Sequence, residues 1–491
     1  MVAAAASIAV VYPHMNSIGG DGFWLIAEPG KEPVAIQACG PAAQRAVPDF
    51  YRNCGDSVIP TRGPRAALTV AGAVAGWMKA LELAQSWGKS LPLPVLLEAA
   101  IEHGRSGVVV TESQKQLTHE KWQELKDLDE FKAIYGGDGN IAIHDILVQD
   151  DLATSLLQLA DAGLGDFYRG DLARQLAIGL ENAGSPLRLE DLEQYRAEFV
   201  KPLSLGLSRC RLYNHPPPTQ GVSSLMILGL FDRAIPVGAE GFEHIHTLRQ
   251  ATKKAFLLQN DHVADERQMK VDCRKWLEPG FLDTEFRKIY PHKALAWPYE
   301  PEPGDTVWMG AADSEGRVVS YIQSIFWEFG SGLVVPGTGI LWQNRGASFS
   351  LTGGPRKLAP GRLPFHTLNP ALATFSDGRV AAYGTMGGEG QPQTQAAVFS
   401  RYAFYGTDIQ QAITAPRWLL GKTWGADATN LKLEARIEPR VIEQLEKAGH
   451  DVESVGPFEE MMGHAGAVIT HRNGLIEGAS DPRADGGCAA L

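Results

Sequence analysis

The chain has 491 residues, of which 44% are hydrophobic and 21% charged, so it can bury a sizeable core as a globular protein. Its net charge of −12 argues against a nucleic-acid partner, because phosphate binding needs concentrated Lys and Arg. No apolar run reaches the ~18 residues of a membrane helix, and the apolar start lacks the basic region of a signal peptide. We therefore expect a cytoplasmic protein. The five cysteines form no C-x-x-C pair, so neither a zinc site nor a disulfide framework is indicated.

The first half of the chain is predicted to be largely helical, with short strands between the helices. A helix is expected over 3–11, followed by a glycine turn and a buried strand over 17–29. Ser185 is expected to cap a helix that runs to residue 195. Further helices are predicted over 74–107 with a break at 91–94, over 150–164, over 171–183, within 214–232 after a proline loop, and over 243–264.

The second half of the chain is predicted to contain more strands than the first. A connector rich in Pro, Trp and Lys, roughly 278–303, is expected to be exposed. Strands are predicted over 306–325 and 373–385, and helices return over 393–405 and 408–414. This order favours a layered fold in which helices cover a sheet. No GxSxG, P-loop or HExxH motif occurs, and the glycines of SIGGDGF lack the GxGxxG spacing.

The stretch GDTVWM (304–309) places a threonine at the start of a predicted strand, directly after a flexible acidic-glycine joint. A threonine hydroxyl becomes a good nucleophile when it lies at a chain N-terminus, because its own α-amine can then take the proton. An internal threonine can reach that state only if the chain cuts itself just before it. On these residues alone, an ordinary strand threonine is the favoured interpretation of Thr306.

Several long segments resemble the γ-glutamyltransferase family, in family order across almost the whole chain. These are VVYPHMNSIGGDGFWLI, PPPTQG (216–221), residues 329–351, residues 383–418 and GASDPRADGG (478–487). The resemblance implies an α+β fold, the four-layer αββα sandwich of the N-terminal nucleophile hydrolases. It also implies a proenzyme that cuts itself into a large subunit (1–305) and a small subunit (306–491), which together form one domain. No cofactor and no metal are expected.

The family's catalytic positions transfer to a short set of residues. Thr306 matches the nucleophile, so the bond between Asp305 and Thr306 is the expected cleavage site. Gly387 and Gly388 match the pair whose N–H groups form the oxyanion hole. Ser324 replaces a threonine that assists the nucleophile. Without the resemblance, the glycines indicate only a turn and Ser324 only a strand hydroxyl.

The substrate-binding positions depart from the family pattern. Gln37 stands in place of the arginine that holds the glutamyl carboxylate, and Phe326 replaces an asparagine. Two further positions also differ: Ser348 replaces the aspartate that binds the α-amine, and His366-Thr367 replaces a Ser-Ser pair. Losing the aspartate and the asparagine removes the partners of a substrate ammonium group, whose burial would be costly without them.

Arg345 stands at a family position that is usually uncharged, and its planar guanidinium suits a carboxylate held by two hydrogen bonds. The WQNRG and PFHTLNP segments look most like the oxamate amidohydrolase and acylase branch of the family. Arg345 is also compatible with a surface or interface ion pair, and His366 with a structural histidine. Asp21 stands where the family commonly has glycine, and serves either as a charge near the pocket or as a turn cap.

We therefore expect an amidohydrolase that cleaves a small carboxylate-bearing amide, such as oxamate or a dicarboxylic monoamide, through an acyl-enzyme. The alternatives are a γ-glutamyl hydrolase or transpeptidase acting on glutathione, and an uncleaved, non-catalytic family member. The expected partners are a small-molecule substrate and the two subunits of one precursor, in a possible homo-oligomer. His244 and His246 point about 200° apart on a helix, so they are not expected to bind a metal together. The chain opens within a helix, so we expect that a segment typical of the family is missing before Met1.

Overall fold

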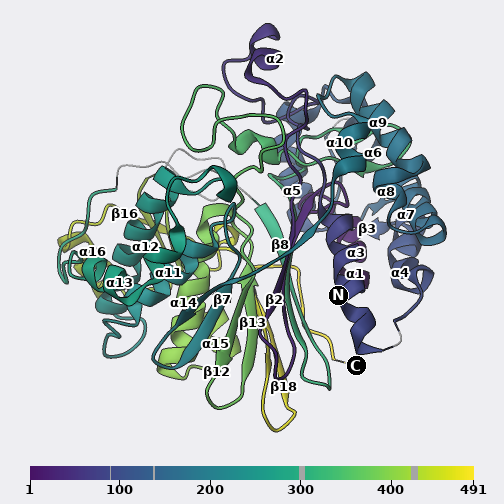
Figure 1. Cartoon of the computed structure of the whole chain (residues 1–491). Coiled ribbons are helices and arrows are strands. Elements are labelled where there is room, and N and C mark those ends of the chain that lie inside the picture. Colours follow the sequence, from purple (N-terminus) through teal and green to yellow (C-terminus); the bar gives the residue numbers. More distant parts are fainter. Residues whose placement is uncertain (89, 137–138, 298–304, 422–428, 491) are drawn as a thin grey trace. The chain divides into compact units, whose positions relative to one another are not determined.

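Residues 1–88, 90–136, 139–297, 305–421 and 429–490 are described by a computed structural model (Figure 1). They fall into two compact units. Unit 1 comprises Met1–Phe23, Ile36–Phe199 and Gln323–Phe365, and unit 2 comprises Trp24–Ala35, Val200–Ile322 and His366–Leu491.

Unit 1 is mainly helical. Its helices are α1 (Val2–Val11), α2 (Pro48–Asn53), α3 (Ala73–Ala84), α4 (Leu93–Ser106), α5 (Glu112–Leu125), α6 (Asp129–Tyr135), α7 (Asp150–Ala162), α8 (Asp166–Arg169), α9 (Asp171–Ala183) and α10 (Leu189–Gln194). Two short strand pairs accompany them: β3 (Val108–Val109) with β4 (Ile146–Leu147), and β10 (Val334–Val335) with β11 (Ile340–Leu341). Helix α4 packs between α1 and α7, because its buried residues lie along one stripe of the helix.

Unit 2 contains a six-stranded antiparallel sheet in the order β18-β17-β13-β12-β7-β6. Its strands are β6 (Leu203–Gly206), β7 (Cys210–Asn214), β12 (Ala371–Phe375), β13 (Val380–Thr385), β17 (Ala465–Thr470) and β18 (Ile476–Ser480). In the register of β13 with β17, Gly384 lies opposite Gly466. A smaller sheet joins β14 (Trp418–Leu420), β15 (Leu431–Glu434) and β16 (Val452–Val455).

Helices cover one side of the six-stranded sheet. They include α11 (Gly221–Phe231), α14 (Gln391–Tyr405) and α15 (Ile409–Thr414), which contact the strands, with α12 (Phe242–His262), α13 (Pro279–Phe286) and α16 (Pro439–Lys447) further out (Figure 1). Every residue of α11 is buried, as expected for a helix that is apolar on all sides and packs against both strands and other helices.

A second sheet has the order β5-β2-β1-β9-β8. Strand β8 (Asp305–Ala312) belongs to unit 2, and the other four strands continue from one unit into the other: β1 (Asp21–Ala27), β2 (Val34–Ala38), β5 (Glu198–Val200) and β9 (Val318–Phe326). In unit 1, the side chain of Gln323 on β9 accepts a hydrogen bond from Trp77 Nε1 of α3 (3.1 Å). Gln323 Nε2 also lies 3.5 Å from the carbonyl of Ala5 on α1, so helices cover this part of the strand.

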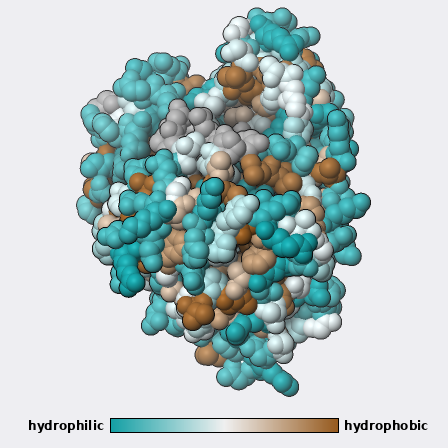
Figure 2. Space-filling view, turned by 90° about the vertical axis from the view of Figure 1, so that its left-hand side faces the viewer, coloured by the Kyte–Doolittle hydropathy of each residue, from teal (hydrophilic) through white to brown (hydrophobic). Residues whose placement is uncertain are grey.

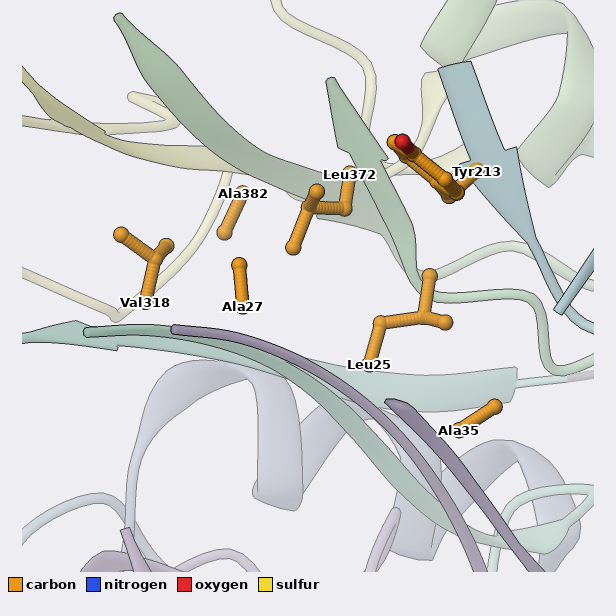
Figure 3. Packing of buried hydrophobic residues seen from close by; sticks show 7 residues of the cluster. All are labelled: Leu25, Ala27, Ala35, Tyr213, Val318, Leu372 and Ala382. Atoms are coloured by element: carbon orange, nitrogen blue, oxygen red, sulfur yellow. The ribbon is translucent and has the colours of Figure 1, made fainter. Parts of the chain in front are cut away.

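In unit 2 the two sheets pack face to face. Leu25, Ala27 and Val318 point from the second sheet towards Leu372 and Ala382 of the six-stranded sheet (Figure 3). Ala35 and Tyr213 complete the cluster, and all seven side chains are buried. Several members are alanines, which lets the two backbones approach closely.

The observed elements confirm the predicted α+β class, and most of the predicted helices are present. The range 373–385 holds two strands, β12 and β13, joined by a turn, and α14 begins two residues earlier than expected. The prediction for Ser185 is wrong: α10 begins at Leu189, and Ser185 Oγ donates to the carbonyl of Ala67 (2.6 Å). The Ser185 hydroxyl is therefore bound to a buried carbonyl far away in the sequence and does not cap a helix. Among the described helices, none combines the length and apolar character needed to cross a bilayer.

The GASDPRADGG segment contributes to a buried ion network in unit 2. Asp481 pairs with Arg417 and, at 3.0 Å, with Arg483, which in turn pairs with Glu434 at 2.6 Å. Burial opposes the ionisation of Asp481, yet Arg417 and Arg483 lower the pKa of its carboxyl. The network ties the end of β18 to β15 and to the segment that enters β14.

We predict that Asp481→Ala lowers the free energy of unfolding by about 3–5 kcal/mol, because it leaves the buried Arg417 guanidinium without its acid and Arg483 with Glu434 alone. Urea denaturation measures the change. The matched control is Asp49→Ala, which removes an exposed pair with Arg52 and should cost about 0–1 kcal/mol. Equal losses in the two variants would contradict a structural role for the network.

Candidate active site

Thr306 is the second residue of β8, and its side chain is almost fully buried. The preceding joint at Gly304 lies outside the described residues, and only the backbone of Asp305 is described. Two residues after Thr306, the Trp308 indole lies against backbone: a Cβ added at Gly384 would be 2.1 Å from Trp308 Cδ1, and one added at Gly466 would be 2.5 Å from Cζ3. This close packing sets the position of β8 against β13 and β17.

The glycine pair lies between the end of β13 and the start of α14. Gly387 and Gly388 have φ values of 114° and 50°, in the region where a side chain would be strained. Within the described part of the chain, neither of their N–H groups donates a hydrogen bond. Their backbone is held by Gln220, whose Nε2 donates to the Gly388 carbonyl (2.7 Å). Two N–H groups before a helix of 15 residues can stabilise negative charge.

Gln391 connects the helix to the threonine. It is the first residue of α14, it is fully buried, and its Nε2 lies 3.5 Å from Thr306 Oγ1. The Asn369 N–H donates to Gln391 Oε1 (3.3 Å), which orients the amide so that its nitrogen points at the hydroxyl. Gln391 was not among the residues predicted from the sequence. Its position three residues after the glycine pair, at a helix start, is the only signal the sequence carries.

His366 and Thr367 lie beside the PPPTQG segment in the same unit. The His366 N–H donates to the Pro218 carbonyl (2.9 Å), and the Gln220 N–H donates to the His366 carbonyl (3.0 Å). Gln220 Nε2 also donates to the Thr367 carbonyl at 2.5 Å. One glutamine thus fixes both the His366-Thr367 segment and Gly388, so these predicted residues are brought together in unit 2.

The remaining predicted residues lie together in unit 1. Ser324 Oγ accepts a hydrogen bond from the Phe326 N–H (2.8 Å) at the end of β9. Phe326 has a φ of 86°, which is strained for a bulky residue and persists only where the surroundings enforce it. The SIGGDGF glycines contribute to this: a Cβ at Gly20 would lie 2.3 Å from the Ser324 carbonyl oxygen.

Arg345 is fully buried, which excludes the surface ion pair considered from the sequence. Its guanidinium carbon lies 3.6 Å from the centroid of the Phe326 ring, a cation–π contact that is strongest in a desolvated setting. Ser348 Oγ lies within hydrogen-bond distance of the carbonyl oxygens of Arg345 (3.0 Å) and Phe365 (3.2 Å), and its single proton is donated to one or shared by both, which stabilises the turn that carries the arginine. The aromatic ring and this turn hold a buried cation in a defined orientation.

Asp21 is fully buried and acts electrostatically on Arg345. The N–H groups of Gly40 (3.2 Å) and Gly72 (3.0 Å) and the Nε2 of Gln343 (3.1 Å) donate to Asp21 Oδ1. Burial raises the pKa of Asp21 to about 7, although Arg345 and these hydrogen bonds act in the opposite direction. Asp21 is therefore a buried carboxyl that anchors three segments of unit 1, which is more than the turn cap considered from the sequence.

Gln37, at the position of the family's carboxylate-binding arginine, lies partly buried on β2. His244 and His246 reach different partners, Ser400 Oγ (2.9 Å) and His450 Nε2 (3.0 Å). Among the described residues, no group of three or more His, Cys, Asp or Glu side chains is arranged to hold a metal. A surface hollow of about 460 Å³ beside α12 and α16 includes none of the predicted site residues.

Comparison with known proteins agrees with this geometry. The family model described as Gamma-glutamyltranspeptidase matches residues 1–491. The chain is 49% identical over 494 residues to an oxamate amidohydrolase proenzyme of Klebsiella pneumoniae subsp. pneumoniae, covering 100% of this chain and 93% of the relative. It is 35% identical over 497 residues to a glutathione hydrolase-like YwrD proenzyme of Bacillus subtilis, again covering 100% and 93%. A crystal structure of cephalosporin acylase from Bacillus halodurans is similar with a TM-score of 0.90, 30% identity and coverage of 100% and 90%.

The chain is thus an enzyme of the class that acts on amide C–N bonds, with the fold of the N-terminal nucleophile hydrolases. It belongs to the γ-glutamyltranspeptidase family. These findings confirm the predicted family, fold class and enzyme class.

We predict a pH-dependent stability difference between the wild type and Asp21→Asn. In the unfolded chain this carboxyl ionises near pH 4, whereas in the folded chain it keeps its proton up to about pH 7. Its contribution to stability is therefore fully present below pH 4 and is lost as the pH rises through 7. The amide introduced by Asp21→Asn keeps an oxygen acceptor and cannot ionise. The melting temperature of the variant relative to that of the wild type should therefore increase between pH 5 and pH 8. A difference that does not change with pH would contradict a raised pKa.

Proposed function

We propose that the chain is a self-processing amidohydrolase in which Thr306 is the nucleophile, and that its substrates carry a carboxylate and no α-amine. The observation that carries the nucleophile assignment is the contact of Thr306 Oγ1 with Gln391, the first residue of the helix that follows Gly387 and Gly388. Family membership over all 491 residues and relatives described as proenzymes support self-processing.

In the proposed maturation, Thr306 Oγ attacks the carbonyl carbon of Asp305. An ester forms as the Asp305–Thr306 C–N bond breaks, and water then hydrolyses the ester. The products are a large subunit ending at Asp305 and a small subunit whose new α-amine belongs to Thr306. An α-amine titrates near pH 8, so at neutral pH it can exchange protons with the adjacent hydroxyl.

In the proposed turnover, the α-amine takes the hydroxyl proton while Thr306 Oγ attacks the substrate amide. The N–H groups of Gly387 and Gly388 stabilise the tetrahedral oxyanion, an effect typically worth about 3–4 kcal/mol of barrier lowering. The proton passes to the leaving ammonia or amine, and water releases the acid from the acyl-enzyme. Ser324 assists at the nucleophile, as the matching family residue does.

The proposed substrate class rests on Arg345 and on the changed positions around it. Arg345 is buried and oriented by Phe326, and a planar guanidinium binds a carboxylate through two parallel hydrogen bonds. Ser348, which stands at the position of the amine-binding aspartate, is engaged with backbone carbonyls. A relative that is 49% identical is described as an oxamate amidohydrolase proenzyme, so oxamate and dicarboxylic monoamides are the first compounds to test.

We predict that the wild-type chain of 53.1 kDa separates on a denaturing gel into bands of about 33 and 20 kDa, in proportion to 305 and 186 of its 491 residues. Thr306→Ala should stay a single chain without turnover, and Thr306→Ser, which keeps a hydroxyl, should still cleave. Intact-mass spectrometry shows whether the small chain begins at Thr306. A wild-type chain that remains whole after long incubation would refute self-processing.

We predict that Arg345→Gln lowers kcat/KM for a carboxylate-bearing amide by roughly 100-fold, because charge-assisted hydrogen bonds to the substrate are lost. Arg345→Lys should lie in between, since it keeps the charge and loses the planar fork. Turnover of oxamate, a glutaryl amide and a γ-glutamyl anilide is compared side by side, with subunit formation checked in each variant. Preferred turnover of the γ-glutamyl compound by the wild type would overturn the substrate assignment.

A further inference from the structure

Helix α12 binds an irregular segment of the chain through three polar side chains on one of its faces. We name residues 290–297 the tether. The tether meets His246, Gln250 and Lys253, which lie at positions i, i+4 and i+7 of the helix. His246 Nε2 lies 2.8 Å from the Tyr290 carbonyl oxygen. The Leu295 N–H donates to Gln250 Oε1 (2.8 Å), and Lys253 Nζ donates to the Leu295 carbonyl (2.6 Å).

The three side chains of α12 bind main-chain atoms of the tether, and residues of other elements make further contacts with it. The Ala294 N–H donates to the carbonyl of Ala448, just after α16 (2.7 Å). The His292 ring stacks on Phe242 with centroids 6.0 Å apart, and the Trp297 ring lies 6.1 Å from that of Phe256. The side of the molecule that carries α13 and α16 is mostly hydrophilic, with apolar residues in small groups (Figure 2). The tether is thus held by hydrogen bonds to its main chain and by ring contacts.

Lys253 is an unexpected residue for a purely structural contact. Its side chain is buried beside Arg249, and within the described chain no carboxylate forms an ion pair with it. Burial and Arg249 lower the pKa of its amine to about 8, so holding it as an ammonium group is unfavourable. A buried cation without an acid usually destabilises a fold. Its only hydrogen bond within that part of the chain joins it to the tether.

The tether lies shortly before the proposed cleavage site. Leu295 precedes Asp305 by ten residues, whereas Phe286 at the end of α13 precedes it by nineteen. Binding of the whole tether, with Leu295 as its hydrogen-bonded residue nearest to Asp305, therefore halves the number of residues between Asp305 and the last anchored residue upstream. A shorter free segment has fewer conformations, so less entropy is lost when the Asp305 carbonyl is brought to the Thr306 hydroxyl.

We propose that Gln250 and Lys253 are positioning residues for self-cleavage, which hold the upstream side of the cleavage site through the main chain of Leu295. This inference rests on the proposed self-processing at Thr306. The two residues bind neither substrate nor the reacting atoms, so their contribution is to the rate of maturation and not to turnover by the mature enzyme.

The test measures maturation and turnover separately. The double variant Gln250→Leu/Lys253→Met loses both hydrogen bonds to Leu295 and keeps most of the side-chain volume. Chains made in a cell-free translation system are chased over time, and conversion to two bands is followed on a denaturing gel. We expect cleavage to slow by up to about 2.6-fold, the factor that loop entropy gives when the whole tether is released and nineteen free residues replace ten. Values of kcat and KM for the mature enzyme should be unchanged.

Two matched variants complete the design. In Gln250→Glu an acceptor for the Leu295 N–H remains, and Gln250 Nε2 has no partner within the described chain, so this variant should cleave at the wild-type rate or faster. Lys254→Met removes a neighbouring lysine that faces Glu285 instead, and should also cleave normally. Lys253→Met alone should give an intermediate rate and replaces the double variant if that chain does not fold.

Limited proteolysis of the tether reports whether it has been released. Slow cleavage together with an accessible tether and normal turnover supports the inference. Cleavage at the wild-type rate with an accessible tether overturns it, and so does an equal loss of kcat, which would indicate general disruption. If the wild-type chain itself is never cleaved, the proposed function fails, and that result is distinguishable because it does not depend on any variant.

Discussion

The packing of one tryptophan on two glycines is the constraint on which the centre of unit 2 depends. The Trp308 ring occupies the space where Gly384 and Gly466, which are paired across β13 and β17, would carry a side chain. Any side chain at either glycine would overlap the indole and push β8 away from the six-stranded sheet. Thr306 is only two residues before Trp308, so its place relative to the turn after β13 follows from this contact. The Trp308 Nε1 donates to Ser320 Oγ (3.0 Å), which joins the indole to the neighbouring strand β9.

Buried glutamine side chains repeatedly hydrogen-bond to irregular backbone in unit 2. A buried amide donates and accepts at once, so it can satisfy irregular backbone that lacks a regular partner. Gln220 holds the carbonyls of Thr367 and Gly388, and Gln391 lies between Asn369 and Thr306. Gln250 does the same for the tether. Side-chain amides thereby supply hydrogen bonds to carbonyl and N–H groups that no strand ladder or α-helix pairs.

The local sequence pattern predicted much of the secondary structure correctly. It failed where a side chain bonds to a residue that is far away in the chain. The apolar periodicity of 243–264 corresponds to α12, and the proline pair near residue 92 separates α3 from α4 as predicted. Ser185 has the sequence features of a helix cap, but the carbonyl of Ala67 binds its hydroxyl, and this partner is 118 residues away. Gln391 was overlooked for a similar reason, because a glutamine at a helix start is common and its meaning depends on what faces it.

Long motifs in a fixed order were sufficient to predict the family and the fold class from the sequence, and they single out Thr306, Gly387 and Gly388 as candidate catalytic residues. Only the tertiary structure decided the environment of the other groups. It buried Arg345 against Phe326, brought Asp21 into its electrostatic range, and bound the tether to α12. The physical reason is that burial, pKa and hydrogen bonding are set by residues that are distant in the chain and adjacent in space, and no local pattern specifies that adjacency.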